Sequence, residues 1–183
     1  MLGPITAGVV VAWGFSEATL FFVLPDVVIT WLAVRRGVFA GLIAALLATV
    51  GTVAGGWVMY RWGATDPAGV GDALVGLPAI DRAMVDQVRS ALAADWRRAL
   101  FGGAFTGVPY KIFAAGAPQV GIALAPFLLV SIAARLARFA SLALVAGVLG
   151  RAAAVRLSTT QRLGLVLAIW VVFYAVYWTV TPS

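Results

Sequence analysis

The sequence predicts an all-α integral membrane protein with two opposed, inverted-repeat-like re-entrant helical hairpins and flanking transmembrane helices. The chain of 183 residues is 63% hydrophobic and 11% charged, whereas a soluble domain has about 25% charged residues. Three apolar segments are long enough to span a bilayer, which needs about 20 residues. Two others are interrupted by proline and glycine, and interrupted backbone at membrane depth must be covered by protein or line a water-filled cavity.

We expect one polytopic membrane domain over residues 1–183. Its expected elements are a first re-entrant hairpin at 4–34, a transmembrane helix at 37–63, a polar loop and amphipathic helix at 64–98, a second re-entrant hairpin at 99–126, and transmembrane helices at 127–150 and 163–181. Each hairpin precedes a longer apolar segment, which is the pattern of an internal repeat with a central site. The two halves have negligible sequence identity, so the repeat is an architectural prediction.

The first hairpin contains two acidic residues in an otherwise uncharged stretch. Glu17 and Asp26 are nine residues apart, and Pro25 directly precedes the aspartate. In a continuous helix nine residues make two and a half turns, so the carboxylates would face opposite ways. Proline interrupts a helix, and a turn at Pro25 would bring both acids to one cavity. The alternative places them at opposite membrane surfaces, since an acid at membrane depth costs about 2.5–3.5 kcal/mol.

The segment 37–60 is uncharged, and in it Gly55 and Gly56 predict close helix approach. The segment 64–98 is polar, with five aspartates and four arginines. We expect its first half, TDPAGVGDALVGLP, to be a loop rich in glycine and proline. From residue 78 on, apolar residues recur every four positions, which predicts an amphipathic helix on the membrane surface or capping the bundle. These residues are Ile80, Met84, Val88, Leu92 and Trp96.

The second hairpin places a lysine at its interruption. Lys111 is the only charged residue between Arg98 and Arg135, and prolines lie on both sides of it, at Pro109 and Pro118. These two prolines and Pro25 are the expected structural hinges. The alternative for Lys111 is a side chain that reaches the membrane surface along its own aliphatic stem.

Two arginines lie within the predicted helix at 127–150. Arg135 and Arg138 are three residues apart and therefore share a helical face. Inside a bundle they could pair with Glu17 and Asp26, or clamp a phosphate group. The alternative ends the membrane segment at Ala134 and puts both arginines at the interface.

Composition also excludes several functions. The chain has no cysteine and no histidine, which removes serine–histidine hydrolysis and most zinc sites. We therefore expect that the protein is not an enzyme and that it has no catalytic residue, no metal ion and no cofactor. Nucleic-acid binding is also disfavoured, because the arginines are scattered through apolar sequence.

The net charge of +6 agrees with positive-inside orientation and attraction to anionic lipid. Arg151, Arg156 and Arg162 form a loop without an acid, which we expect to be cytoplasmic. The arginines that bound the segment 37–60 lie at both of its ends, so the charge rule is ambiguous there.

Four motifs resemble the DedA family, also known as the VTT or SNARE-associated Golgi protein superfamily, and within it the YqaA-like branch. They are the run E-x7-P-D ending at Asp26, TVAGGWVMYRWG at 52–63, FTGVPYKIFAAGA at 105–117 and PFLLVSIAARLARF at 126–139. The resemblance covers residues 10–150 in order. It implies two opposed re-entrant hairpins that meet near the bilayer midplane, and a role in moving lipids across or between leaflets.

The resemblance also implies site residues. The family's acidic pair corresponds to Glu17 and Asp26, and its basic residues to Lys111, Arg135 and Arg138. Many bacterial members carry arginines on both sides of the second hairpin's proline. Here Ala104 and Thr106 precede it, and a lysine follows.

We therefore expect a flippase-like or scramblase-like lipid transporter of the bacterial inner membrane. The expected substrate is a phosphate-bearing lipid such as undecaprenyl phosphate or a phospholipid, and the expected partners are anionic lipid headgroups and protons. The sequence is also compatible with a homodimer. The alternative is a proton-coupled exporter of a cation or small drug, in which the carboxylates bind the solute and the arginines are structural.

Overall fold

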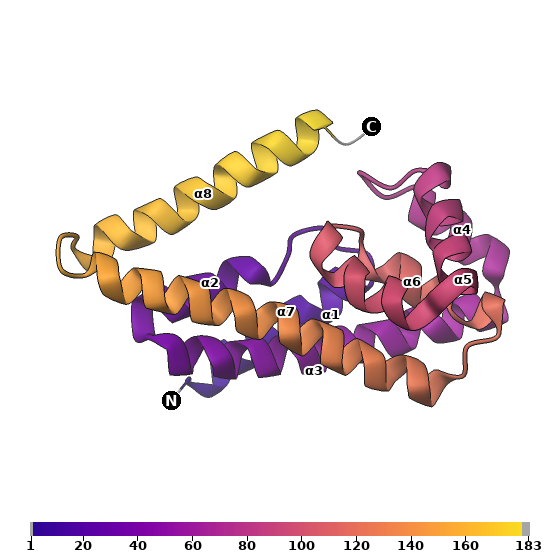
Figure 1. Cartoon of the computed structure of the whole chain (residues 1–183), viewed down its shortest axis with the longest axis horizontal. Coiled ribbons are helices and arrows are strands. Elements are labelled where there is room, and N and C mark those ends of the chain that lie inside the picture. The colour runs from indigo at the N-terminus through magenta and orange to yellow at the C-terminus, as the bar shows by residue number, and fades with distance from the viewer. Residues whose placement is uncertain (1, 181–183) are drawn as a thin grey trace.

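The computed structural model describes residues 2–180, and every regular element in that range is a helix (Figure 1). The helices are α1 (Pro4–Ala18), α2 (Asp26–Arg36), α3 (Val38–Thr65), α4 (Pro67–Val75), α5 (Arg82–Thr106), α6 (Tyr110–Gly116), the 3-10 turn η1 (Pro118–Val120), α7 (Leu124–Ala153) and α8 (Thr159–Val180). Three of them, α3, α7 and α8, are long and apolar enough to cross a membrane. The all-helical class is confirmed, and these three helices coincide with the three predicted transmembrane segments. The predicted helix 163–181 ends one residue outside the described range.

Helix α3 lies at the centre and contacts α1, α2, α6 and α7. Its glycines make these contacts possible, because a larger side chain would collide with the neighbouring helix. A Cβ atom at Gly55 would lie 2.7 Å from the carbonyl oxygen of Phe15 in α1, and one at Gly56 would lie 2.6 Å from the ring of Tyr110 in α6. The predicted close approach at this glycine pair is confirmed.

The first interrupted segment forms two helices joined by a non-helical connection at 19–25. Helix α1 packs on α3, and α2 packs on α3, α7 and α8. Figure 1 shows that α1 begins and α2 ends at the same end of the molecule. Trp13 of α1 donates its indole N–H to the carbonyl oxygen of Val23, 2.9 Å away, which ties the connection to α1. Pro25 directly precedes the first turn of α2, a position where proline is tolerated.

The second interrupted segment has its breaks at 107–109 and 117–123, on either side of α6. Lys111 lies inside the first turn of α6 rather than in a break, and Pro109 and Pro118 start α6 and η1. Helix α7 begins at Leu124, three residues before the predicted start. Pro126 fits there because the first turn of a helix needs no N–H donor from it.

The expected loop after residue 64 was wrong in part, because it contains α4. The carboxylate of Asp66 accepts the backbone N–H of Gly69 at 2.9 Å, and Pro67 occupies the first helical position. Asp81 caps α5 in the same way, accepting the N–H of Met84 at 2.7 Å. An N-terminal aspartate cap supplies an acceptor for an otherwise unpaired N–H group.

Helix α5 extends past the predicted boundary at residue 98 to Thr106, with non-helical backbone at Asp95 (φ −153°, ψ 88°). The part before Asp95 is the predicted amphipathic helix, and Val88 and Leu92 on it are buried against the core that includes Ile112 of α6. Of the two placements that we expected, this packing favours the helix that caps the bundle.

Candidate functional site

The five predicted charged residues lie together where the two interrupted segments meet. Glu17, Asp26, Lys111 and Arg135 are only 3%, 0%, 3% and 4% exposed. The side chain of Arg138 is 14% exposed. Such burial of five charges in one place is costly unless they compensate one another.

The site lies near mid-depth of the longest packed helices. The hydroxyl of Thr52 in α3 donates to the carbonyl oxygen of Gly14, 3.3 Å away. At 1.5 Å per residue, Thr52 is about 20 Å from either end of α3. Glu17 follows Gly14 by about one turn of α1. It therefore also lies far from both ends of the neighbouring helix α3. The alternative in which Glu17 is a boundary residue disagrees with this position.

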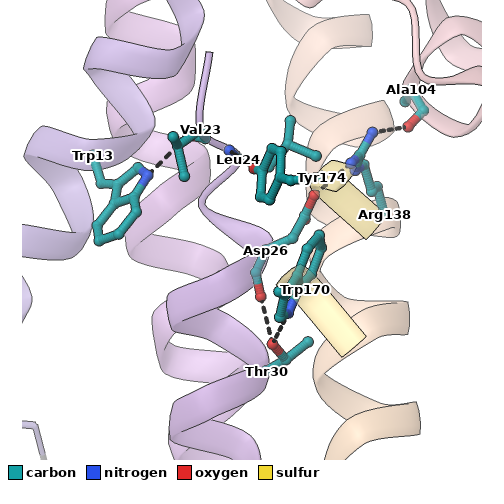
Figure 2. Close-up of polar contacts among 9 residues, drawn as sticks. All are labelled: Trp13, Val23, Leu24, Asp26, Thr30, Ala104, Arg138, Trp170 and Tyr174. Atoms are coloured by element: carbon teal, nitrogen blue, oxygen red, sulfur yellow. Dashed lines mark hydrogen bonds and ion pairs between the residues drawn. The ribbon is translucent and has the colours of Figure 1, made fainter. Parts of the chain in front are cut away.

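Asp26 and Arg138 form a buried ion pair between α2 and α7. One guanidinium nitrogen of Arg138 donates to Asp26 Oδ2, and the other donates to the carbonyl oxygen of Ala104 in α5 at 2.6 Å (Figure 2). Asp26 also lies in the first turn of α2, where the helix dipole stabilises a negative charge. Arg138 therefore connects three helices and pairs with one oxygen of Asp26, while the Oδ1 atom of Asp26 is buried without a hydrogen-bond partner. Helix α7 continues through both arginines and Arg135 is buried, which favours their placement inside the bundle over the alternative that puts both at the interface.

Lys111 joins the two interrupted segments directly. Its ammonium group donates to the carbonyl oxygen of Phe21, 2.5 Å away, in the connection between α1 and α2. This carbonyl lies outside any helix, so it has no helical N–H to accept. The lysine of the second segment therefore satisfies one backbone acceptor in the break of the first segment, as an interruption in an apolar environment requires.

Arg135 lies over an aromatic ring that we did not predict as a site residue. Its guanidinium carbon is 4.4 Å from the ring centre of Tyr110, and the ring of Phe127 lies parallel to that of Tyr110 with the ring centres 6.1 Å apart. Cation–π contact of this kind strengthens when the cation is desolvated. The signal in the sequence was the tyrosine adjacent to Lys111 in GVPYKIF, although adjacency alone does not show which cation the ring contacts.

Glu17 is the least compensated member of the site. Its charge acts on both Lys111 and Arg135, yet within the described residues it forms no ion pair, and its Oε2 atom is buried without a hydrogen-bond partner. It also lies near the C-terminus of α1, where the helix dipole disfavours a negative charge. The two carboxylates therefore differ, since Asp26 is paired and Glu17 faces two cations without contact.

Helix α8 is joined to the connection before Asp26 by one hydrogen bond and to α2 by another. The backbone N–H of Leu24 donates to the hydroxyl of Tyr174 at 2.8 Å. The indole N–H of Trp170 donates to the hydroxyl of Thr30 at 2.9 Å, and that hydroxyl donates to the backbone carbonyl of Asp26 at 2.8 Å (Figure 2). Sequence reasoning did not identify these partners. The four-residue spacing of Trp170 and Tyr174 was the available signal for a shared face.

Removing the Tyr174 hydroxyl is expected to loosen α8 locally. In Tyr174→Phe the N–H of Leu24 loses its acceptor, and a typical hydrogen bond contributes about 1 kcal/mol. Amide hydrogen exchange should accelerate in α8 and at residues 19–25, with little change in α3. The control is Tyr60→Phe, which removes a 2.6 Å bond to the carbonyl oxygen of Ile122 elsewhere. Unchanged exchange in α8 would show that this bond does not hold the helix.

No family model, curated protein or solved structure matches this chain. Membership of the DedA family therefore stays a prediction from the sequence motifs. Among residues 2–180, no group of three or more carboxylates lies close enough to hold a metal ion.

Proposed function

We propose that this protein is a membrane lipid transporter of the flippase or scramblase type that moves a phosphate-bearing lipid, with protons as the coupling ion. The observation that carries the proposal is the buried group of three cations and two carboxylates between two interrupted segments. Buried ionisable groups in membrane segments are costly, and they typically mark a transport pathway. The motif resemblance to the DedA family, whose members are bacterial inner-membrane proteins among others, supports the same proposal.

The two interrupted segments are, in this proposal, opposed re-entrant hairpins related as an inverted repeat. Supporting this, α1 begins and α2 ends at one end of the molecule (Figure 1), while Lys111 of the second segment reaches the connection of the first. Transporters of this kind place their substrate at the contact between two such segments.

The charge of the site favours an anionic substrate. Three cations face two carboxylates, so the site carries one uncompensated positive charge when all five groups are ionised. A lipid phosphate would bind Lys111 and Arg135, the two cations that lack a contacting carboxylate, while Arg138 stays with Asp26. A site for exporting cations would need an excess of negative charge, and no observation favours that function.

Glu17 is the proposed proton carrier. It faces Lys111 and Arg135 from a distance, and a phosphate bound to those cations would leave its carboxylate buried and uncompensated. Such a buried charge is costly, so Glu17 takes up a proton. When the lipid leaves, Glu17 ionises again and compensates the cations. Undecaprenyl phosphate and phospholipids are both substrates of suitable chemistry.

The test is lipid movement in proteoliposomes. Glu17→Gln and Arg135→Ala are each expected to reduce the transfer of a fluorescent phosphatidylglycerol across the bilayer to the rate of protein-free liposomes. The matched controls are Asp72→Asn and Arg82→Ala, which remove an exposed ion pair and should leave the rate unchanged. Size-exclusion profiles and helix content check that each variant is folded. Full transport by both site variants would overturn the mechanism.

The same liposomes distinguish the proposed lipid transporter from the alternative, a cation exporter. If the protein exports cations, a dye that reports monovalent cation flux should respond in the wild type and fail in Glu17→Gln. It should still respond in Arg135→Ala, because arginine would then be structural. Lipid movement that depends on both residues, without cation flux, supports the lipid transporter.

A further inference from the structure

Five arginines outside the site gather at one end of the molecule. Arg35 and Arg36 end α2, Arg151 lies in the last turn of α7, Arg156 lies in the connection to α8, and Arg162 lies in the first turn of α8. We call this set the arginine end. No acidic residue occurs in 27–65 or in 96–183, so none lies near it in the chain.

Packing brings the two parts of the arginine end together. A Cβ atom at Gly150 of α7 would lie 3.2 Å from the Cα atom of Val34, and one at Gly147 would lie 3.0 Å from the Cα atom of Val38. A guanidinium nitrogen of Arg162 donates to the carbonyl oxygen of Gly150 at 3.0 Å. Figure 1 shows the α2–α3 and α7–α8 connections at the same end.

The opposite end is electrically balanced. It carries five arginines and five aspartates, namely Arg61, Arg82, Arg89, Arg97 and Arg98 with Asp66, Asp72, Asp81, Asp86 and Asp95. Helix α3 joins the two ends with 28 residues, about 42 Å, which exceeds the hydrocarbon thickness of about 30 Å. The net charge of +6 therefore lies almost wholly at the arginine end, with the remaining positive charge in the buried site.

Four of these arginines are free to bind a ligand. Arg35, Arg36, Arg151 and Arg156 are exposed, and within the described residues their side chains make no hydrogen bond or ion pair. Guanidinium groups bind phosphate oxygens through two parallel N–H donors. The arginine end therefore offers a multivalent site for phosphate groups.

Exposed apolar side chains lie among these arginines, and they indicate which kind of ligand the arginine end binds. Phe39 is 74% exposed and Val155 is 86% exposed. Large apolar side chains beside arginines suit a membrane interface, where the rings and methyl groups enter the acyl region and the guanidinium groups stay at the headgroups. A soluble anion or a nucleic acid would not cover them.

We propose that the arginine end is the cytoplasmic end of the protein and that Arg35, Arg36, Arg151 and Arg156 bind anionic phospholipid headgroups of the cytoplasmic leaflet. Positively charged ends stay on the cytoplasmic side of membranes, and that leaflet attracts juxtamembrane arginines through its anionic lipids. Helix α4 and the exposed part of α5 then lie on the opposite side. The proposal is independent of lipid transport.

The first test is orientation, and the chain suits it because it contains no cysteine. Single cysteines are introduced at Ala154, in the α7–α8 connection, and at Ala83, in α5, both of which are exposed. In spheroplasts a membrane-impermeant maleimide should label Ala83→Cys directly and Ala154→Cys only after permeabilisation. The reverse pattern, or direct labelling at both positions, would overturn the orientation.

The matched comparison removes four arginines from either end. Replacing Arg35, Arg36, Arg151 and Arg156 by glutamine should produce mixed orientations, with both cysteines labelled directly in part of the population. Replacing Arg61, Arg82, Arg97 and Arg98, all exposed, should leave the labelling pattern unchanged. Equal behaviour of the two sets would show that the arginine end does not determine orientation.

The second test measures headgroup preference in nanodiscs. A fluorophore on Ala154→Cys should be quenched about threefold more by brominated phosphatidylglycerol than by brominated phosphatidylcholine, and a fluorophore on Ala83→Cys equally by both. The preference should disappear in the variant without the four arginines, and at about 1 M salt, where the Debye length is about 3 Å. Equal quenching at Ala154, or a preference that survives the substitutions, would overturn the lipid contact.

Discussion

Replacing Arg138 with alanine is expected to lower the free energy of unfolding by about 3–5 kcal/mol, the usual cost of removing one member of a buried ion pair. The reason is that Asp26 is fully buried and Arg138 is its only ion-pair partner among the described residues. The substitution also removes the donor to the Ala104 carbonyl oxygen. Reversible denaturation of the purified protein in mixed micelles gives the free energy.

Two comparisons make this result specific to the pair. Arg151→Ala, an exposed arginine at the end of the same helix, should change the free energy of unfolding by less than about 0.5 kcal/mol. Asp26→Asn combined with Arg138→Ala should recover part of the loss, because the uncompensated carboxylate is gone. If Arg138→Ala behaves like Arg151→Ala, the ion pair does not stabilise the fold.

The second large effect is expected at Gly51, where α1 and α3 have no room for a side chain. A Cβ atom there would lie 2.9 Å from the backbone nitrogen of Phe15 and would also collide with the backbone of Val11. Backbone atoms of a packed helix cannot rotate away, so Gly51→Leu would force the two helices apart. We expect a loss of about 3 kcal/mol, at the upper end of the range for overpacking.

The matched control for Gly51 is Gly8, which lies in α1 and where a Cβ atom would have no neighbouring atom within 4 Å. Gly8→Leu should be neutral or slightly stabilising, because glycine weakens a helix by about 0.5–1 kcal/mol. Denaturation in the same micelles compares the two variants directly. Similar losses at both positions would show that the close contact between α1 and α3 at Gly51 does not determine the effect.

Local sequence signals explain both the correct and the wrong element predictions. Long apolar segments without proline predicted α3, α7 and α8 because a spanning helix needs length and composition alone. The loop expected after residue 64 was wrong because glycine content was weighed above the helix start formed by Asp66 and Pro67. An aspartate followed by proline is itself a helix N-terminus signal.

The composition of the site was predictable, but its pairings were not. Each of the five charged residues stood out because a charge in an apolar segment is costly. Which carboxylate contacts which cation depends on helices that are far apart in the chain, and the Asp26–Arg138 contact spans 112 residues. The contacts of Tyr110 and Tyr174 were missed for the same reason, since an aromatic residue in an apolar helix has many available neighbours.

The sequence by itself predicted the membrane class, the three long apolar helices, the two interruptions and the five charged residues within apolar segments. These properties follow from composition and local spacing, which act within one segment. Only the tertiary structure decided that Asp26 is paired while Glu17 is not, and that Arg35 and Arg36 lie at the same end as Arg151. The physical reason is that charge compensation and the gathering of like charges depend on distances across the bundle, and the packing of glycine faces sets those distances.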